Sequence, residues 1–118
     1  MSFKLIDMEM WARKEYFIHY HSVVPCFYSM TVKIDITKIK AAGKKLYPTM
    51  LHALSSVINQ HEELRMGFDE QGRLGVYDKL DPSYAVFHSE SETFSTNWTE
   101  YSKDYETFCN AYQQDLGT

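Results

Sequence analysis

Five histidines are the side chains that could move protons near neutral pH: His19, His21, His52, His61 and His88. Paired metal ligands or acid–base partners need to share one face of an element, as in His-x-x-x-Asp or Glu-x-x-His. None of the five has that spacing, and the pairs closest in sequence fall on different sides of their predicted helices. We therefore predict a hydrogen-bonded or solvated structural role for each histidine.

Motifs for nucleophiles and for phosphate binding are missing as well. The sequence contains no Gly-x-Ser-x-Gly segment and no glycine-rich phosphate loop, with five glycines in all. Cys26 follows Pro25 and could be an exposed thiol, but no charged neighbour in the sequence would activate it. We interpret it as a small residue that lines a pocket. Cys26 and Cys109 form no CxxC pair and no metal-ligand spacing, so no metal is expected.

Length and composition narrow the class of protein. The chain has 118 residues, the size of one domain, and 44% of them are hydrophobic. Nine Tyr, seven Phe and two Trp could fill a core or line a pocket for a flat, amphipathic ligand. A net charge of −4 with scattered basic residues argues against a nucleic-acid partner. No signal peptide and no apolar stretch of about 20 residues is visible, so we expect a soluble cytoplasmic chain without a membrane partner.

Apolar periodicity predicts the elements that would position a site. The strongest strand signal is the period-two alternation from Tyr28 to Ile36. Helices are expected at Trp11–His21, Thr37 to about Gly43, Tyr47 to about His61, and from about Ser102. A hairpin is expected from Leu64–Phe68 and Leu74–Tyr77, followed by a strand at Tyr84–His88. This order predicts an α/β (α+β) fold of two layers, a mixed sheet flanked by helices.

The helix from Tyr47 should pack on an apolar surface, because five apolar residues recur on one of its faces at spacings of three and four. These residues are Met50, Leu51, Leu54, Val57 and Ile58. The last helix has a comparable stripe, formed by Tyr105, Phe108 and Tyr112.

Five short segments form an ordered set that can be compared with known families. They are Trp11–Glu15, Val24–Cys26, Arg65-Met66, Tyr84–His88 and Glu92–Ser95. Together they resemble the amino-terminal half of a chloramphenicol acetyltransferase, from about Phe3 to the end of the chain. The catalytic signature of that family, His-His-x-x-x-Asp-Gly, lies near its carboxyl end and is absent here. We therefore expect residues 1–118 to be a single domain of this family, truncated before that segment.

The resemblance implies an activity as well as a fold. Enzymes of the family are trimers whose active sites lie between neighbouring subunits, with acetyl-CoA as co-substrate. A histidine of the half that is absent here acts as general base on the primary hydroxyl of chloramphenicol. A serine of the same half supports the oxyanion of the tetrahedral intermediate.

Several residues of this chain match the antibiotic pocket of the family. Tyr20 and Phe94 resemble its aromatic walls, and Val24 and Cys26 resemble small lining residues. Tyr28 stands where many relatives have another aromatic, so its hydroxyl would alter the pocket. Without the resemblance, Tyr20 and Phe94 would be interpreted as ordinary core aromatics.

Arg13 matches a supporting position rather than a pocket position. It resembles the arginine that pairs with the aspartate of the absent signature and so holds the catalytic loop. Without the resemblance, Arg13 would be interpreted as a surface partner of Glu9, a contact worth little.

Two functions from different classes follow. In the first, the chain is the substrate-side portion of an acetyl-CoA-dependent chloramphenicol O-acetyltransferase and is inactive alone. In the second, it is a non-catalytic truncated relic, or a module that binds a small molecule or a partner. In either case uncovered strand edges and apolar faces should make the isolated chain self-associate.

Overall fold

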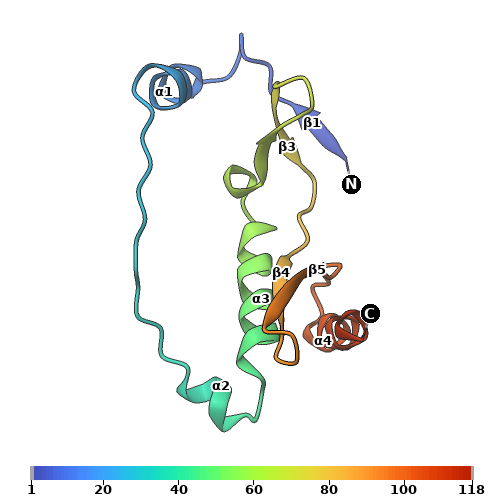
Figure 1. The fold of residues 1–118 in the computed structure, drawn as a ribbon. Helices are drawn as coiled ribbons and strands as arrows, with labels where there is room; N and C mark the ends of the chain where they lie inside the picture. Colours follow the sequence, from blue (N-terminus) through green and yellow to red (C-terminus); the bar gives the residue numbers. More distant parts are fainter. Residues whose placement is uncertain (1, 118) are drawn as a thin grey trace.

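Residues 2–117 are described by a computed structural model, whose fold is drawn in Figure 1. The helices are α1 (Lys14–Ile18), α2 (Thr37–Ala41), α3 (Leu46–Ile58) and α4 (Tyr105–Leu116), with a π-helical turn at His19–Val23 and a 3-10 turn at Glu62–Arg65. The strands are β1 (Phe3–Leu5), β2 (Met66–Phe68), β3 (Leu74–Tyr77), β4 (Ser83–His88) and β5 (Thr93–Trp98). The predicted α/β class is confirmed, with the strands in two small antiparallel sheets. In this part of the chain, no helix is long and apolar enough to cross a bilayer.

The first sheet has the order β1-β3-β2 and contains the predicted hairpin. Asp69 holds the turn, because its carboxylate accepts the backbone amides of Gln71 and Arg73 and pairs with the Arg73 guanidinium at 2.8 Å. The third strand, β1, has no clear signal in the sequence and comes from the start of the chain. Gly75 permits its close approach, since a Cβ at that position would lie 2.6 Å from the Lys4 carbonyl oxygen.

The second sheet, β4-β5, packs with α4 around a small aromatic core. Tyr84 of β4 is buried together with Phe108 and Tyr112 of α4, which confirms the predicted stripe of the last helix. The ring centroids of Tyr84 and Tyr112 are 5.3 Å apart, and the Tyr84 and Thr99 hydroxyls form a hydrogen bond of 2.6 Å. Burial raises the pKa of Tyr112 above its ordinary value, and the neighbouring Tyr84 adds to this. This core fixes α4 against the β4-β5 hairpin.

Residues 24–36 form no strand, so the prediction of a strand over Tyr28–Ile36 is wrong for this structure. Figure 1 shows them as a long span that joins the turn after α1 to α2 and stands apart from the other elements. Phe27 is 94% exposed and Met30 72%. A strand needs a neighbour whose N–H and C=O groups pair with its own, and no part of residues 2–117 supplies one.

Helix α3 lies where the sequence predicts it, but it packs through the opposite side. Thr49 bonds to the hydroxyl of a tyrosine in α4 at 2.8 Å, and the imidazole of His52 bonds to a backbone carbonyl just before α4 at 2.9 Å. On the predicted apolar face, Leu54 is 56% exposed and Val57 49%. Helices normally bury such a stripe. In α3, by contrast, the polar side is covered by other elements and much of the apolar side is exposed.

The molecule is expanded for its length. Its radius of gyration is 17.8 Å, against about 13.5 Å for a compact domain of this size. Its accessible surface is 9594 Å², against about 6,700 Å² for a folded monomer of this mass. Roughly 2,900 Å² of additional surface is therefore exposed relative to a typical compact protein.

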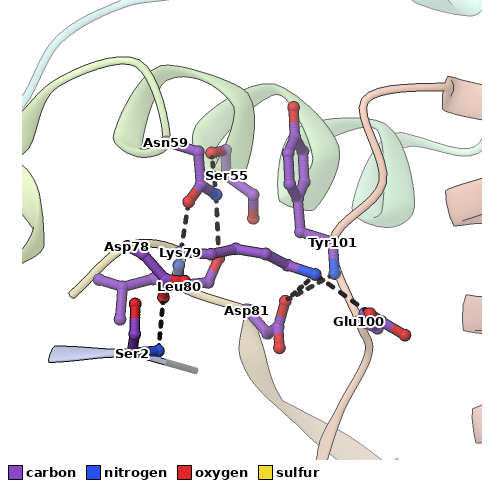
Figure 2. A network of polar contacts seen from close by, with 9 residues as sticks. All are labelled: Ser2, Ser55, Asn59, Asp78, Lys79, Leu80, Asp81, Glu100 and Tyr101. Carbon is purple, nitrogen blue, oxygen red and sulfur yellow. Dashed lines mark hydrogen bonds and ion pairs between the residues drawn. The ribbon is translucent and has the colours of Figure 1, made fainter.

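Asn59, just after α3, ties this helix to the connection between the two sheets (Figure 2). Its amide nitrogen donates to the carbonyls of Ser55 and Leu80, at 2.8 and 2.9 Å, and its amide oxygen accepts the Leu80 backbone N–H at 2.9 Å. One side chain thus satisfies both backbone groups of a half-buried residue. Asn59 fixes where the chain turns from β3 toward β4.

Lys79 extends the same network toward the second sheet (Figure 2). Its ammonium group lies 3.5 Å from Asp81 and 3.2 Å from Glu100, and Asp81 also accepts the backbone N–H of Tyr101 at 2.8 Å. Desolvation opposes the charged form of Lys79, but the hydrogen bond to Glu100 and both negative charges outweigh it and raise its pKa. Lys79 is partly exposed and Glu100 largely exposed, so these ion pairs add little and we assign the stability of the connection mainly to Asn59.

Replacing Asn59 by alanine should lower the free energy of unfolding by about 2 kcal/mol, because two half-buried backbone groups of Leu80 lose their partner. The matched control is Gln60→Ala, which shortens the exposed neighbouring side chain at the same helix end. Urea unfolding followed by circular dichroism gives both values. Equal losses for the two variants would show that the Asn59 hydrogen bonds do not stabilise the connection.

Candidate functional site

Four of the five predicted pocket residues lie in one segment directly after α1. In the π-helical turn, the Val24 amide donates to the His19 carbonyl at 2.7 Å, and the Cys26 amide donates to the Tyr20 carbonyl at 3.3 Å. These bonds hold Tyr20, Val24 and Cys26 on one wide turn, and Tyr28 follows in the extended span. Single π-helical turns are frequent at functional sites. Sequence patterns do not reveal this turn, because the residues preceding it continue an ordinary helix.

The predicted pocket residues of this segment are open to solvent. Tyr20 is 56% exposed, Val24 52% and Tyr28 84%, and Cys26 is an exposed free thiol. Phe94, the fifth residue, is 70% exposed. The interpretation of Tyr20 and Phe94 as core aromatics therefore does not hold in this chain.

An aromatic cluster anchors this segment to the first sheet. The Phe17 ring stacks on His21 with centroids 5.0 Å apart, and both rings contact Phe68 of β2, at 6.2 and 5.2 Å. Trp11 contacts Phe17 from the other side at 5.7 Å. These residues hold the turn that carries Tyr20, although the resemblance gives them no role in a pocket. In the sequence, only their positions in a predicted helix and a predicted strand indicate that these residues could pack together.

Phe94 lies on the second sheet, on a face of the hairpin that nothing covers within residues 2–117. It sits directly opposite Phe87 in the β4-β5 register, and Trp98 of the same strand lies on the same face. Phe87 is 67% exposed and Trp98 64%. Among the described residues, no ring contact joins Phe94 to Tyr20 or Tyr28. The structure thus gathers four of the predicted pocket residues on one segment and leaves the fifth on another surface.

Arg13 borders an open groove of about 870 Å³ on the first sheet, which is also lined by Trp11, Arg65 and Tyr77. Arg13 takes part in none of the ion pairs of residues 2–117, so the pair with Glu9 that would be assumed without the resemblance is not formed. The five residues predicted to line the antibiotic pocket do not line this groove. Arg13 therefore stands on a different surface from them, with its guanidinium available to a further partner.

Arg65 strengthens the wall of this groove. Its guanidinium donates to the Tyr77 carbonyl at 2.9 Å and to the Ile58 carbonyl at 3.2 Å. Because one of these acceptors is in β3 and the other ends α3, Arg65 joins the first sheet to that helix. Its role in this chain is structural.

Two of the histidines, His52 and His88, occupy hydrogen-bonded environments of the kind predicted for them. His52 lies among Tyr101, Tyr105 and Phe108, with ring centroids 5.3 to 5.7 Å away. His88 contacts the hydroxyl of a serine in β5 at 2.8 Å on an exposed surface. Such a pair resembles half of a nucleophile–base arrangement, but the described residues supply no third group to orient it. Across residues 2–117, no cluster of three His, Cys, Asp or Glu side chains is placed to hold a metal ion.

Comparison with known proteins identifies the family to which these features belong. The sequence profile of the family described as chloramphenicol acetyltransferase matches residues 1–118. This chain belongs to the chloramphenicol acetyltransferase family. Chloramphenicol acetyltransferases of Campylobacter coli and Vibrio anguillarum are 53% and 51% identical to it, each over 98% of this chain. A solved chloramphenicol acetyltransferase structure superposes with a TM-score of 0.85 and 26% identity, over 99% of this chain.

The chain spans just over half the length of the chloramphenicol acetyltransferases that it matches. It covers 56% of the Campylobacter coli protein, 54% of the Vibrio anguillarum protein and 56% of the solved chain. The expectation that the resemblance covers nearly all of this chain and one half of the family is confirmed. The roles assigned to the five pocket residues and to Arg13 stay predictions, because these matches contain no ligand.

Replacing Phe17 by alanine should loosen the turn that carries Tyr20, at a cost of about 2 kcal/mol, because a half-buried ring leaves the cluster. Trp11 emission should shift to longer wavelength, since its ring loses its neighbour 5.7 Å away. Tyr16→Ala is the control, because Tyr16 is the adjacent residue and is 70% exposed. Unchanged emission and stability in Phe17→Ala would contradict an anchoring role.

Proposed function

We propose that this chain is the substrate-side portion of an acetyl-CoA-dependent chloramphenicol O-acetyltransferase. The observation that carries the proposal is the match of the family profile to the whole chain, with relatives above 50% identity that are nearly twice as long. The chain contributes pocket residues in this proposal. The general base and the oxyanion donor come from the portion that the longer relatives contain in addition.

The pocket residues suit an aromatic acceptor that carries an alcohol. Tyr20, Tyr28 and Phe94 supply rings that can stack on the aromatic ring of chloramphenicol, and Val24 and Cys26 leave room beside them. All five side chains are exposed, so they can contact a ligand once the pocket is completed. Arg13, with no ion pair inside residues 2–117, would support the catalytic loop by pairing with an aspartate.

Two of the histidines described above, His21 and His52, are poor candidates for the base. His21 is stacked on Phe17, and His52 uses one ring nitrogen on a backbone carbonyl inside an aromatic cluster. A general base must reach the hydroxyl proton of the substrate, whereas the His21 ring is stacked on a phenylalanine and the His52 ring is bonded to a backbone carbonyl. This supports an external histidine in that role.

The assembly and location belong to the same proposal. We place the completed active site between subunits of a homotrimer, and we place the enzyme in the cytoplasm, where bacterial acetyl-CoA is found. Acetyl-CoA enters as a substrate, and no residue of this chain is assigned to it.

The chain alone should release no thiol from acetyl-CoA in the presence of chloramphenicol, because it lacks a base and an oxyanion donor. Residues 1–117 fused to the remaining portion of the Campylobacter coli relative should restore chloramphenicol-dependent release, measured with a thiol reagent. Turnover by the chain alone would contradict the proposed division of roles. A folded but inactive fusion that still binds the antibiotic would favour a non-catalytic binding module.

In the active fusion, Tyr20→Ala should reduce kcat/KM for chloramphenicol by about tenfold or more, which corresponds to about 1.4 kcal/mol of lost transition-state binding. Tyr16→Ala is the control, since both tyrosines are exposed and Tyr16 lies one turn earlier. Equal kinetics for the two variants would exclude Tyr20 from the pocket.

A further inference from the structure

His19 stands at the junction between α1 and the π-helical turn that carries most of the predicted pocket residues. Its backbone N–H donates to the carbonyls of Glu15 and Tyr16 in α1, and its own carbonyl accepts the Val24 amide at 2.7 Å. The backbone of His19 is therefore fixed on both sides. The geometry of the turn determines where its side chain points.

The imidazole of His19 packs against the predicted pocket wall. Its centroid lies 4.8 Å from that of the Tyr20 ring, and the two ring planes meet at 84°. On a regular α-helix, residues adjacent in sequence do not face each other. The contact occurs where the backbone departs from α-helical geometry, at the start of the π-helical turn. An edge-to-face pair of this kind is a favourable arrangement of aromatic rings, and it leaves at least one face of Tyr20 open.

Both ring nitrogens of His19 are without a hydrogen-bond partner among residues 2–117, whereas the rings of His21, His52 and His88 each have one. The side chain of His19 is also exposed, so a ligand can reach these nitrogens. His61 has no ring hydrogen bond either, but within the described part of the chain no ring contact joins it to a predicted pocket residue. His19 is thus the histidine with free nitrogens beside Tyr20.

The chemistry of the predicted pocket gives these nitrogens a use. The five predicted lining residues supply mainly ring faces and small side chains, which contact a ligand over a large area but select little between its polar groups. Pockets for small molecules fix the orientation of the ligand through a few well-placed polar groups on an otherwise apolar wall. A neutral imidazole offers one N–H donor and one acceptor nitrogen. His19 therefore brings a hydrogen-bonding group to an aromatic surface.

We propose that His19 is a specificity-determining residue, whose imidazole N–H donates a hydrogen bond to a substituent on the aromatic ring of the substrate that can only accept one, such as the nitro group of chloramphenicol. In the proposed function Tyr20 stacks on that ring, and a ring stacked there brings its substituents within reach of the neighbouring imidazole. This inference rests on the proposed function. It adds which part of the substrate the segment after α1 distinguishes.

The test uses the fusion of residues 1–117 to the remaining portion of the Campylobacter coli relative, with two substrates: chloramphenicol and its analogue in which hydrogen replaces the nitro group. His19→Phe keeps a ring beside Tyr20 and removes both nitrogens. It should lower kcat/KM for chloramphenicol by about fivefold, mainly through KM, because the lost bond is present in ground state and transition state alike. The analogue never makes this bond, so its kcat/KM should change by less than about twofold.

Two further variants separate the hydrogen bond from a structural effect. His19→Gln has an N–H donor but no ring, so it should recover about half or more of the loss for chloramphenicol, which a purely packing role of the imidazole would not allow. His61→Phe is the matched control, because it makes the same substitution at the other exposed histidine whose ring has no hydrogen bond within residues 2–117. It should leave the kinetics of both substrates unchanged.

The remaining outcomes are distinct. Equal losses for the two substrates, or no loss for either, would overturn the inference, since His19 would then act only on the shape of the turn or not at all. A fall in kcat of about hundredfold or more with both substrates would make His19 the general base, and would overturn the inference together with the proposed division of roles. If the fusion binds chloramphenicol without acetylating it, the proposed function fails. The dissociation constants of the two compounds then give the same comparison, and a loss confined to chloramphenicol would still support the role of His19.

Discussion

Polar contacts along one side of α3 hold this molecule together. Thr49 and His52 connect the helix to the start of α4, and Asn59 connects its end to the segment between the sheets. Both sheets and α4 are positioned through this helix. Its polar contacts therefore connect the elements in the way that an apolar core does in most domains of this size. The buried core beyond it is small and consists mainly of Tyr84, Phe108 and neighbouring residues.

The sequence predicts elements best where the pattern and the covering partner lie within the chain. The stripe of α4 is buried as predicted, and the hairpin of β2 and β3 forms around Asp69. The alternation at 28–36 is as regular, yet it forms no strand, because pairing depends on groups that a local pattern does not contain. β1 is the opposite case: it has three residues and little pattern, and it forms because β3 offers an edge shaped by Gly75.

The candidate site likewise has features that the sequence predicts and features that it does not. The resemblance points to residues that the structure leaves exposed, which suits a surface that is still to be completed. It could not predict the π-helical turn that carries Tyr20, nor the stacking of Phe17 on His21 that anchors it. The Phe17 and His21 rings also contact Phe68 of β2, which lies far away in the sequence, and a local pattern does not contain that contact. Phe94 and Arg13 lie on separate surfaces, so they can contribute to one site only if further structure connects those surfaces.

The inverted packing of α3 has a consequence for the order of events during synthesis. In a full-length relative, the equivalent of this helix leaves the ribosome well before the remaining portion of about 90 residues, which takes roughly 5–20 s to add. Through that interval the side chains that correspond to Leu54 and Val57 would face solvent on an otherwise hydrogen-bonded helix. Apolar side chains exposed in this way are prone to non-native association until the second portion is added.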